Sequence, residues 1–166
     1  MVNAFTSYLR KRGSNTPGWL VKYMISFWTP YLGAGIKIEE ISSDYRYIKV
    51  CLKQTWYNRN YVGTQFGGSL YAMTDPFYML MLINNLGQDY YVWDKGATID
   101  FVAPGKTNVT AEFRINDEII EKVLKETASG DKYIFDLPVQ VIDANGELVA
   151  SVLKKLYVRK KKKERS

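Results

Sequence analysis

The stretch from Leu70 to Ile83 constrains the fold of this chain most strongly, because it is almost wholly apolar and carries one charge, Asp75. A helix that is apolar on nearly every side has to be surrounded by the rest of its domain. A single antiparallel sheet that curls around the helix can surround it. We therefore expect a central helical region over residues 64–86, with Gly87 as its C-cap.

The segments on either side of this region predict an α+β fold in which two strands come before the central helix and four come after it. Alternating apolar and polar side chains mark strands, and clusters of Gly, Pro, Asn, Asp and Ser mark the turns between them. Asn116 or Asp117 should cap a short helix, and residues 143–146 should form a hairpin turn. The expected strands are residues 36–41, 45–53, 97–102, 109–115, 132–142 and 148–158.

A second apolar stretch, Trp19 to Leu32, follows the basic residues 10–12 and superficially resembles a signal peptide. It is interrupted by Lys22 and Pro30 and is too short to span a bilayer, so we expect no transmembrane segment. Thr16 followed by Pro17 indicates a capped helix start. The sequence therefore predicts an amphipathic helix over residues 17–30 that packs on the domain. Membrane association through this aromatic helix is the alternative.

Composition excludes several kinds of catalytic site. The chain of 166 residues contains no histidine, so Ser-His-Asp and Cys-His catalysis and histidine metal sites are ruled out. The single cysteine, Cys51, lies in an apolar strand pattern and is expected to be a core residue. No disulfide framework can form within one chain, which fits a cytoplasmic protein. We expect no metal site and no phosphate loop or dinucleotide fingerprint.

The net charge of +6 is concentrated at the C-terminus, where eight Lys or Arg and one Glu follow from Lys154 onward. The rest of the chain is therefore near neutral. Such a tail can contact nucleic acid or anionic lipid, but a solubilising terminus is the simpler interpretation, so we expect no specific nucleic-acid partner. The chain divides into an N-terminal helical extension (1–35), a main domain (36–158) and a basic tail (159–166).

Glycines crowd the start of the central helix, at Gly63, Gly67 and Gly68. A glycine pair lets a backbone approach a ligand closely, and the unpaired N–H groups that open a helix can donate to an oxygen that carries negative charge. Close packing of the helix on a sheet is the alternative. A lone carboxylate among apolar residues, here Asp75, is costly unless it is exposed, paired or chemically used. Because Pro76 follows, Asp75 can equally be a helix N-cap.

The spacing of these residues resembles a known family. Acyl-CoA thioesterases of the hotdog fold, the phenylacetyl-CoA type in particular, contain Asn-x-x-Gly-x-x-His-Gly-Gly, with an acid seven residues after the last glycine. The positions that match this pattern are Asn60, Gly63, Gly67, Gly68 and Asp75, while Phe66 replaces the histidine. The amino-acid sequence of residues 63–76, 90–95 and 101–105 looks more like that of a branch grouped as a thioesterase-like domain of unknown function. The resemblance covers roughly residues 36–158.

The resemblance implies a hotdog fold that assembles edge to edge into a homodimer or a homotetramer. It also implies an acyl-CoA thioesterase, in which Asp75 activates water and the Gly67 and Gly68 amides hold the oxyanion. Asn60 would orient a water or hold the loop. Coenzyme A would enter only as part of the substrate, and an acyl-carrier thioester is the other possible carrier. The expected substrate-binding residues are Gly63, Phe66, Ser69, Trp93 and Lys95.

Several of these residues also have structural interpretations. Phe66 is expected to be a packing residue, since a phenyl ring cannot replace an imidazole as a hydrogen-bonding partner. The segment 93–95 places a polar pair at a tunnel mouth or forms a surface ion pair. Lys95, Lys106 and Arg114 are candidate contacts for the phosphates of coenzyme A. The alternative functions are a non-catalytic acyl or lipid binder and a nucleic-acid-associated module that uses the basic tail.

Overall fold

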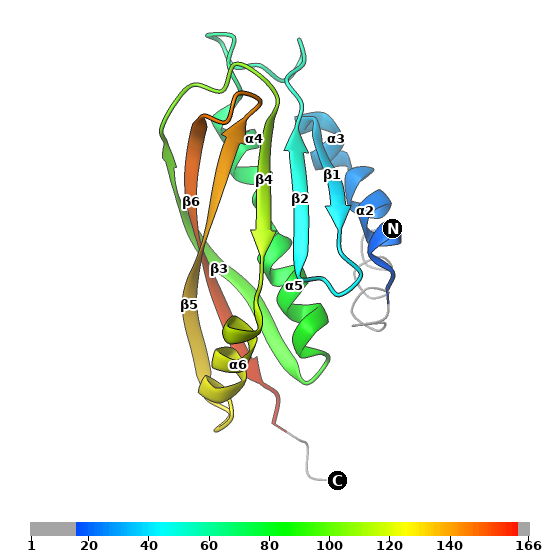
Figure 1. Ribbon diagram of the computed structural model, residues 1–166, viewed down its shortest axis with the longest axis vertical. Helices are drawn as coiled ribbons and strands as arrows, with labels where there is room; N and C mark the ends of the chain where they lie inside the picture. Colours follow the sequence, from blue (N-terminus) through cyan, green and yellow to red (C-terminus); the bar gives the residue numbers. More distant parts are fainter. Residues whose placement is uncertain (1–15, 163–166) are drawn as a thin grey trace.

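The computed structural model describes residues 16–162 and shows a six-stranded antiparallel sheet curled around a helical segment (Figure 1). This is the expected α+β hotdog arrangement, with two strands before the central helix and four after it. The strand order across the sheet is β1-β2-β4-β5-β6-β3, so β1 and β3 are the two edges. The strands are β1 (Ile36–Ile41), β2 (Tyr47–Leu52), β3 (Tyr90–Phe101), β4 (Val109–Arg114), β5 (Lys132–Asp143) and β6 (Leu148–Lys160).

Strand β3 is longer than the sequence pattern predicts, because it begins at Tyr90 and not at Ala97. Its register against β6 shifts between Asp94 and Gly96, which leaves Lys95 as an extra residue in the ladder. A bulge of this kind changes which residues face inward, so the simple alternation that marks a strand is lost at this point. That loss explains why the first half of β3 does not stand out in the sequence.

The central helical region is two helices, α4 (Gly67–Ala72) and α5 (Phe77–Leu86), and not one continuous helix. The chain breaks over residues 73–76 because Pro76 has no N–H group to continue the helical hydrogen bonds. Helix α5 buries four side chains against the sheet, which are Phe77, Tyr78, Met81 and Leu82. Gly87 ends α5 with a φ of 78°, which confirms it as the C-cap.

The N-terminal stretch forms two helices, α2 (Gly18–Ser26) and α3 (Thr29–Ala34), where one was expected. The prediction that Thr16 caps the first helix with its side chain is wrong. The N-cap position of α2 is Pro17, and the Thr16 carbonyl instead accepts a hydrogen bond of 2.7 Å from the Tyr45 hydroxyl. Val21, Ile25 and Tyr31 are part of the hydrophobic core, so these helices belong to the same packed unit as the sheet.

Two local predictions are confirmed near the other end of the chain. Asn116 caps α6 (Asp117–Glu126), where its side-chain oxygen accepts a hydrogen bond of 3.0 Å from the N–H of Ile119. The Asp143 carboxylate closes the β5–β6 hairpin by accepting from the N–H groups of Asn145 and Glu147, at 2.8 and 3.0 Å. In both places a short polar side chain satisfies backbone donors that the helix or the strands leave unpaired.

Strand β6 continues to Lys160 and therefore includes the first two residues of the region expected to be a basic tail. Residues 163–166, which complete that tail, and the basic residues 10–12 lie outside the part of the chain that the structure describes. Among residues 16–162, no helix is long and apolar enough to cross a membrane.

Candidate functional site

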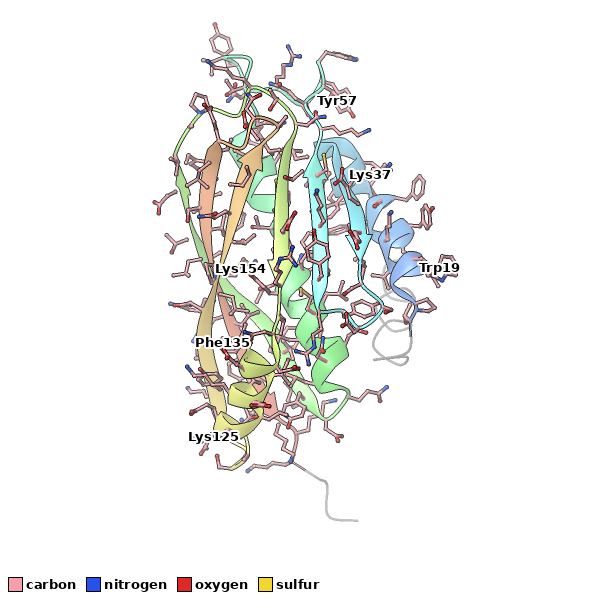
Figure 2. All side chains as sticks on the ribbon, in the orientation of Figure 1. Trp19, Lys37, Tyr57, Lys125, Phe135 and Lys154 are labelled. Carbon is pink, nitrogen blue, oxygen red and sulfur yellow. The ribbon has the colours of Figure 1, made fainter. Side chains whose placement is uncertain are left out.

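A buried lysine marks the inner face of the sheet. From Val152 to Val158 strand β6 alternates strictly, so that Val152, Lys154, Leu156 and Val158 face the core while Leu153 and Lys155 face out. Lys154 is 2% exposed, which is rare for a lysine unless its charge is paired. Figure 2 shows it in the middle of the sheet, among strands, far from both ends of the molecule.

Two carboxylates pair with this lysine. The Nζ atom of Lys154 donates to Oδ1 of Asp75 at 2.7 Å and lies 3.4 Å from Oδ1 of Asp94. Asp75 comes from the break between α4 and α5, and Asp94 comes from β3, so the cluster ties the central helix to the sheet. Tyr71 from α4 presents its ring to the same ammonium group, with its centroid 5.9 Å from Nζ.

The two carboxylates differ in their surroundings. The Asp75 side chain is 51% exposed, whereas that of Asp94 is 16% exposed. Burial raises the pKa of Asp94 from 3.8 to about 6, against the lowering effect of Lys154, and the neighbouring Asp75 raises it further. Within residues 16–162, neither carboxylate oxygen of Asp94 has a hydrogen-bond partner, so the ion pair with Lys154 is its main compensation. The site therefore holds one accessible and one enclosed carboxylate around a shared cation.

Tyr31 fixes the backbone at the helix break. Its hydroxyl donates to the Asp75 carbonyl and lies 3.4 Å from the Ala72 carbonyl. Burial is the main cause that raises the pKa of Tyr31, and the negative charges of Asp75 and Asp94 raise it further, so the hydroxyl remains a donor. Because Tyr31 belongs to α3, the N-terminal helices help to position the site.

The interpretation of Asp75 as a helix cap is wrong. Pro76 occupies the N-cap position of α5, which begins at Phe77, and no side-chain cap hydrogen bond is formed there. The Asp75 side chain instead turns to Lys154, whose buried charge needs a partner more than the exposed helix end does. The carboxylate is therefore fixed in position and still reaches the surface.

The glycine pair lies where α4 begins and is packed against aromatic rings. A Cβ on Gly67 would lie 3.1 Å from the Phe101 ring, and one on Gly68 would lie 2.4 Å from the Phe66 ring. Only glycine fits at Gly68 without moving the ring. Phe66 packs over the first turn of the helix and is 55% exposed, while Ser69, in the same turn, is buried.

Asn60 organises the loop that leads to α4. Its side-chain oxygen accepts from the N–H groups of Val62 and Thr64, and its amide donates to the Thr64 hydroxyl at 2.8 Å and to the Gln65 carbonyl at 3.2 Å. Gly63 has a φ of 81° in this loop, a conformation that favours glycine. Every hydrogen bond described for the Asn60 side chain lies within residues 60–65, so its geometry is that of a loop-holding residue.

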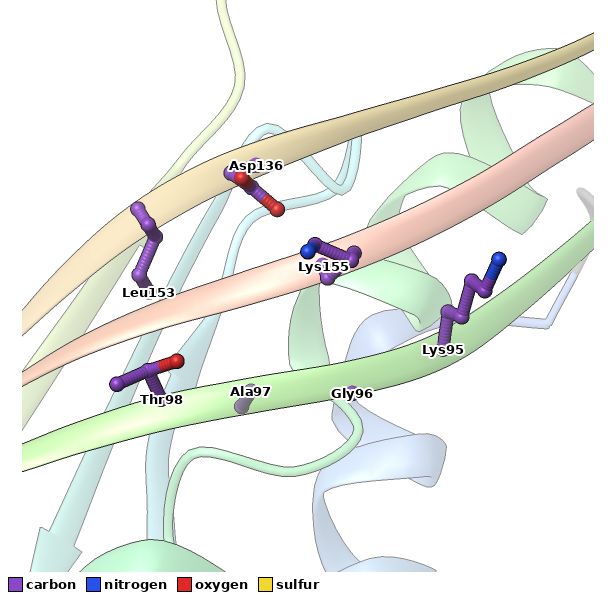
Figure 3. Close-up of a pocket in the computed structure, with 7 residues that line it drawn as sticks. All are labelled: Lys95, Gly96, Ala97, Thr98, Asp136, Leu153 and Lys155. Carbon is purple, nitrogen blue, oxygen red and sulfur yellow. The ribbon is translucent and has the colours of Figure 1, made fainter.

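Trp93 and Lys95 do not join the cluster. Lys95 lies on the outer face of the sheet, where it lines a shallow hollow with Asp136, Leu153 and Lys155 (Figure 3). Trp93 is exposed beside Asp94, whose side chain turns inward to Lys154. The expectation of an ion pair within residues 93–95 is therefore wrong, because successive side chains of a strand point to opposite faces, and Asp94 faces inward while Lys95 faces outward.

The sequence prediction of the site lacks Lys154 and includes Asp94 only as part of the polar pair of residues 93–95. Lys154 was counted with the C-terminal charges, although alternation from Val152 to Val158 places it inward together with the apolar residues. A polar residue in register with the core face is the signal that identifies it. No comparable signal exists for Asp94, since its inward position depends on the bulge. Among residues 16–162, no group of His, Cys, Asp and Glu could hold a metal ion.

Comparison with known protein families identifies residues 18–158 with one model, the domain of unknown function DUF4442. The chain belongs to the DUF4442 family. No curated protein matches this sequence.

Several solved structures share the fold of this DUF4442 protein. PA5026 from Pseudomonas aeruginosa, described as a protein of unknown function and "Probable Thioesterase", has a TM-score of 0.78 at 20% identity over 87% of this chain and 97% of its own. Thioesterase HI1161 from Haemophilus influenzae has a TM-score of 0.64 at 12% identity over 93% and 99%. The Escherichia coli PaaI protein, from the phenylacetic acid degradation operon, has a TM-score of 0.57 at 18% identity over 86% and 91%. These likenesses show a thioesterase-like hotdog fold.

Proposed function

We propose that this protein hydrolyses acyl thioesters, with coenzyme A as the acyl carrier and Asp75 as the general base. The observation that carries the proposal is the half-exposed Asp75 carboxylate, which stands at the break of the central helix and is fixed by a buried lysine at 2.7 Å. A general base has to be accessible to water and held in one orientation. Asp75 meets both requirements, and the hotdog fold of known thioesterases supports the assignment.

The reaction needs one water and no redox step. Asp75 takes a proton from water as the water oxygen attacks the thioester carbonyl carbon. The tetrahedral oxyanion collapses, the carbon–sulfur bond breaks, and the proton passes from Asp75 to the departing thiolate sulfur. The products are a carboxylic acid and free coenzyme A. Backbone N–H groups of Gly67 and Gly68 are the proposed oxyanion donors, and each such donor typically lowers the activation free energy by about 3 kcal/mol.

The site requires two copies of the chain. Gly67 opens the six-residue helix α4 and Asp75 lies beyond its other end, so that at about 1.5 Å per residue about 9 Å of helix separates the two groups in one copy. An oxyanion and its attacking water lie much closer together than this. Edge strand β3 carries one unpaired side on which a second copy can continue the sheet. We therefore propose a homodimer, or a tetramer of two dimers, in which one copy supplies Asp75 and the other supplies the glycines.

Asp75→Asn tests the role of the carboxylate, because an amide keeps the size and can still accept a hydrogen bond from Lys154 but cannot take a proton. Hydrolysis of short, long and aromatic acyl-CoA esters by the full chain should fall about 100-fold or more. Asp136→Asn, on the exposed outer face of β5, is the matched control and should leave the rate unchanged. Equal rates for Asp75→Asn and wild type would exclude Asp75 as the base.

The oligomer has a separate test. Light scattering after size-exclusion chromatography at micromolar concentration should give the mass of a dimer or a tetramer. A monomer would contradict the shared site, whatever the hydrolysis rate. Mixing Asp75→Asn with a variant that blocks the glycine amides, Gly68→Pro, should restore part of the activity, since one of the two sites in a mixed dimer is intact.

A second candidate function is acyl-CoA binding without hydrolysis. Two observations favour it: Phe66 replaces the histidine of related thioesterases, and the proposed base is already engaged in an ion pair. A binder would retain acyl-CoA on the wild-type protein without turnover. Equilibrium dialysis with a non-hydrolysable thioether analogue, combined with a hydrolysis rate equal to that of buffer, would establish this function in place of the first.

A further inference from the structure

The outward side of the N-terminal helices is aromatic. Residues Trp19, Tyr23 and Phe27 are spaced four apart, which places them on one side of α2. Trp28 and Leu32 continue this surface onto α3. We call these five residues the aromatic face; each is between 48% and 69% exposed. The opposite side of the same helices contributes Val21, Ile25 and Tyr31 to the core, and the Trp28 ring packs on Tyr31 with centroids 5.5 Å apart.

A second aromatic segment lies next to this face. The loop of residues 53–66 exposes Trp56, Tyr57 and Tyr61, and Asn58 fastens it to the end of α3 by donating to the Ala34 carbonyl at 2.9 Å. Figure 2 shows Trp19 projecting from α2 away from the sheet and Tyr57 at the end of the molecule where α3 lies. Exposed apolar surface of this extent usually marks an interaction site.

The segments that carry these aromatic residues are basic. Residues 16–38 and 53–66 contain four Lys or Arg and no Asp or Glu, which are Lys22, Lys37, Lys53 and Arg59. The adjacent acids Glu39 and Glu40 lie on β1, where Glu39 is 3.8 Å from the ammonium group of Lys49. Lys22 lies between Trp19 and Tyr23 in α2, where its ammonium group donates to the Glu39 carbonyl at 2.6 Å, and Lys53 and Arg59 lie in the adjacent loop. The chain as a whole mixes 23 basic with 17 acidic residues, so both segments are more basic than the chain average. An anionic partner fits this surface.

We propose that the aromatic face docks this protein on the surface of a bilayer that contains anionic lipids. Trp and Tyr side chains combine an apolar ring with a polar group and favour the level of the lipid headgroups, while nearby lysines attract anionic lipid. An interfacial helix uses such a face without crossing the membrane. Helix α2 packs on edge strand β1, whereas the second copy of the chain is expected at the opposite edge, β3, so dimerisation leaves the aromatic face uncovered.

Co-sedimentation of the full chain with vesicles tests this proposal independently of any hydrolysis. We expect binding to vesicles of mixed phosphatidylglycerol and phosphatidylcholine that weakens at high salt, and much weaker binding to phosphatidylcholine alone. The double variant Trp19→Ser/Phe27→Ser should lower the partition constant about tenfold or more. Lys22→Gln should lower it about fivefold. Trp fluorescence should shift to the blue when wild type binds.

Helix α6 supplies matched controls far from the aromatic face. Leu124→Ser and Lys125→Gln change one exposed apolar and one exposed basic residue and should leave the partition constant unchanged. Three results would overturn the proposal. The first is that wild type does not bind phosphatidylglycerol vesicles at low salt, and the second is that Lys160→Gln/Lys162→Gln abolishes binding while the aromatic variants bind normally. The third is that Trp19→Ser/Phe27→Ser dissociates the oligomer.

Discussion

Lys154 and Lys155 are neighbours in β6, yet they occupy opposite sides of the sheet and very different environments. Lys154 is enclosed and shared by Asp75 and Asp94. Lys155 is exposed and lines an outer hollow with Asp136 (Figure 3). The difference arises only from the alternation of side chains along a strand. It shows that the position of a charge in the strand repeat, and not its place in a basic sequence, decides whether it is structural.

The two environments also differ in how strongly charges interact. In the enclosed cluster the effective dielectric constant is low, so attraction between charges and the cost of removing them from water are both large. On the outer face, water and salt screen the same charges, and their pairwise contributions are usually below about 1 kcal/mol. Substitutions on the inner and outer faces should therefore have clearly different effects, and the following predictions test that difference.

The largest difference should come from the two lysines themselves. Lys154→Met leaves Asp75 and Asp94 facing each other without a cation, and we expect the free energy of unfolding at pH 7 to fall by about 4 kcal/mol. Lys155→Met should change it by less than about 0.5 kcal/mol. Urea denaturation followed by circular dichroism measures both. Equal losses for the two variants would show that the inner cluster is no more important than the outer surface.

The pH dependence of stability should differ between variants of Asp94 and Asp136, and this effect should be smaller than that of the lysines. The pKa of Asp94 in the folded protein is raised from 3.8 to about 6, so its protonated form contributes stability below pH 4. That contribution is lost as the pH rises through 6. Asp94→Asn does not titrate, so its stability relative to wild type should improve between pH 4 and pH 7, by up to about 3 kcal/mol. The free energy of unfolding of the outer variant Asp136→Asn should change with pH in the same way as that of wild type. If Asp94→Asn also followed wild type over this range, the prediction would be contradicted.

The smallest effect should distinguish an inner from an outer tyrosine. Tyr31→Phe removes the hydroxyl that donates to the Asp75 carbonyl, and the free energy of unfolding should fall by about 1 kcal/mol. Tyr91→Phe, on exposed β3, should be nearly neutral. Thermal unfolding can resolve this difference. If Tyr91→Phe proves as destabilising as Tyr31→Phe, the hydroxyl of Tyr31 has no special role at the helix break.

Much of the fold could be predicted from local chemistry in the sequence. The apolar run around α5 required a surrounding sheet, and the caps at Asn116 and Gly87 mark helix ends that the structure confirms. The alternation of apolar and polar residues predicted the end of β4 to within one residue. These features depend on neighbours within a few positions, and the sequence contains all of that information.

The site was harder to predict from the sequence because it depends on contacts between distant segments. Asp75 and Lys154 are 79 positions apart, and nothing in either local pattern indicates their pairing. The N-cap motif at Asp75 and Pro76 favoured a local role, but the demand of a buried ammonium group for a partner outweighs it. The thioesterase roles of Asn60, Gly67, Gly68 and Asp75 remain predictions that the proposed experiments test.

The bulge at Lys95 shifts the inward and outward alternation of side chains along β3 by one residue. Ahead of the bulge Val92 and Asp94 face inward, and beyond it Ala97 and Ile99 do so, because all four pair with inward residues of β6. If the same residues paired with β6 without a bulge, Tyr91 and Trp93 would face inward ahead of this point, and the partner of Lys154 would be lost without any change to Asp94 itself. Deletion of Lys95 would not have this effect, because a strand without the extra residue keeps Asp94 and Ala97 on the same face. The extra residue therefore allows Asp94 and Ala97, which are an odd number of positions apart, to share the inner face of the sheet.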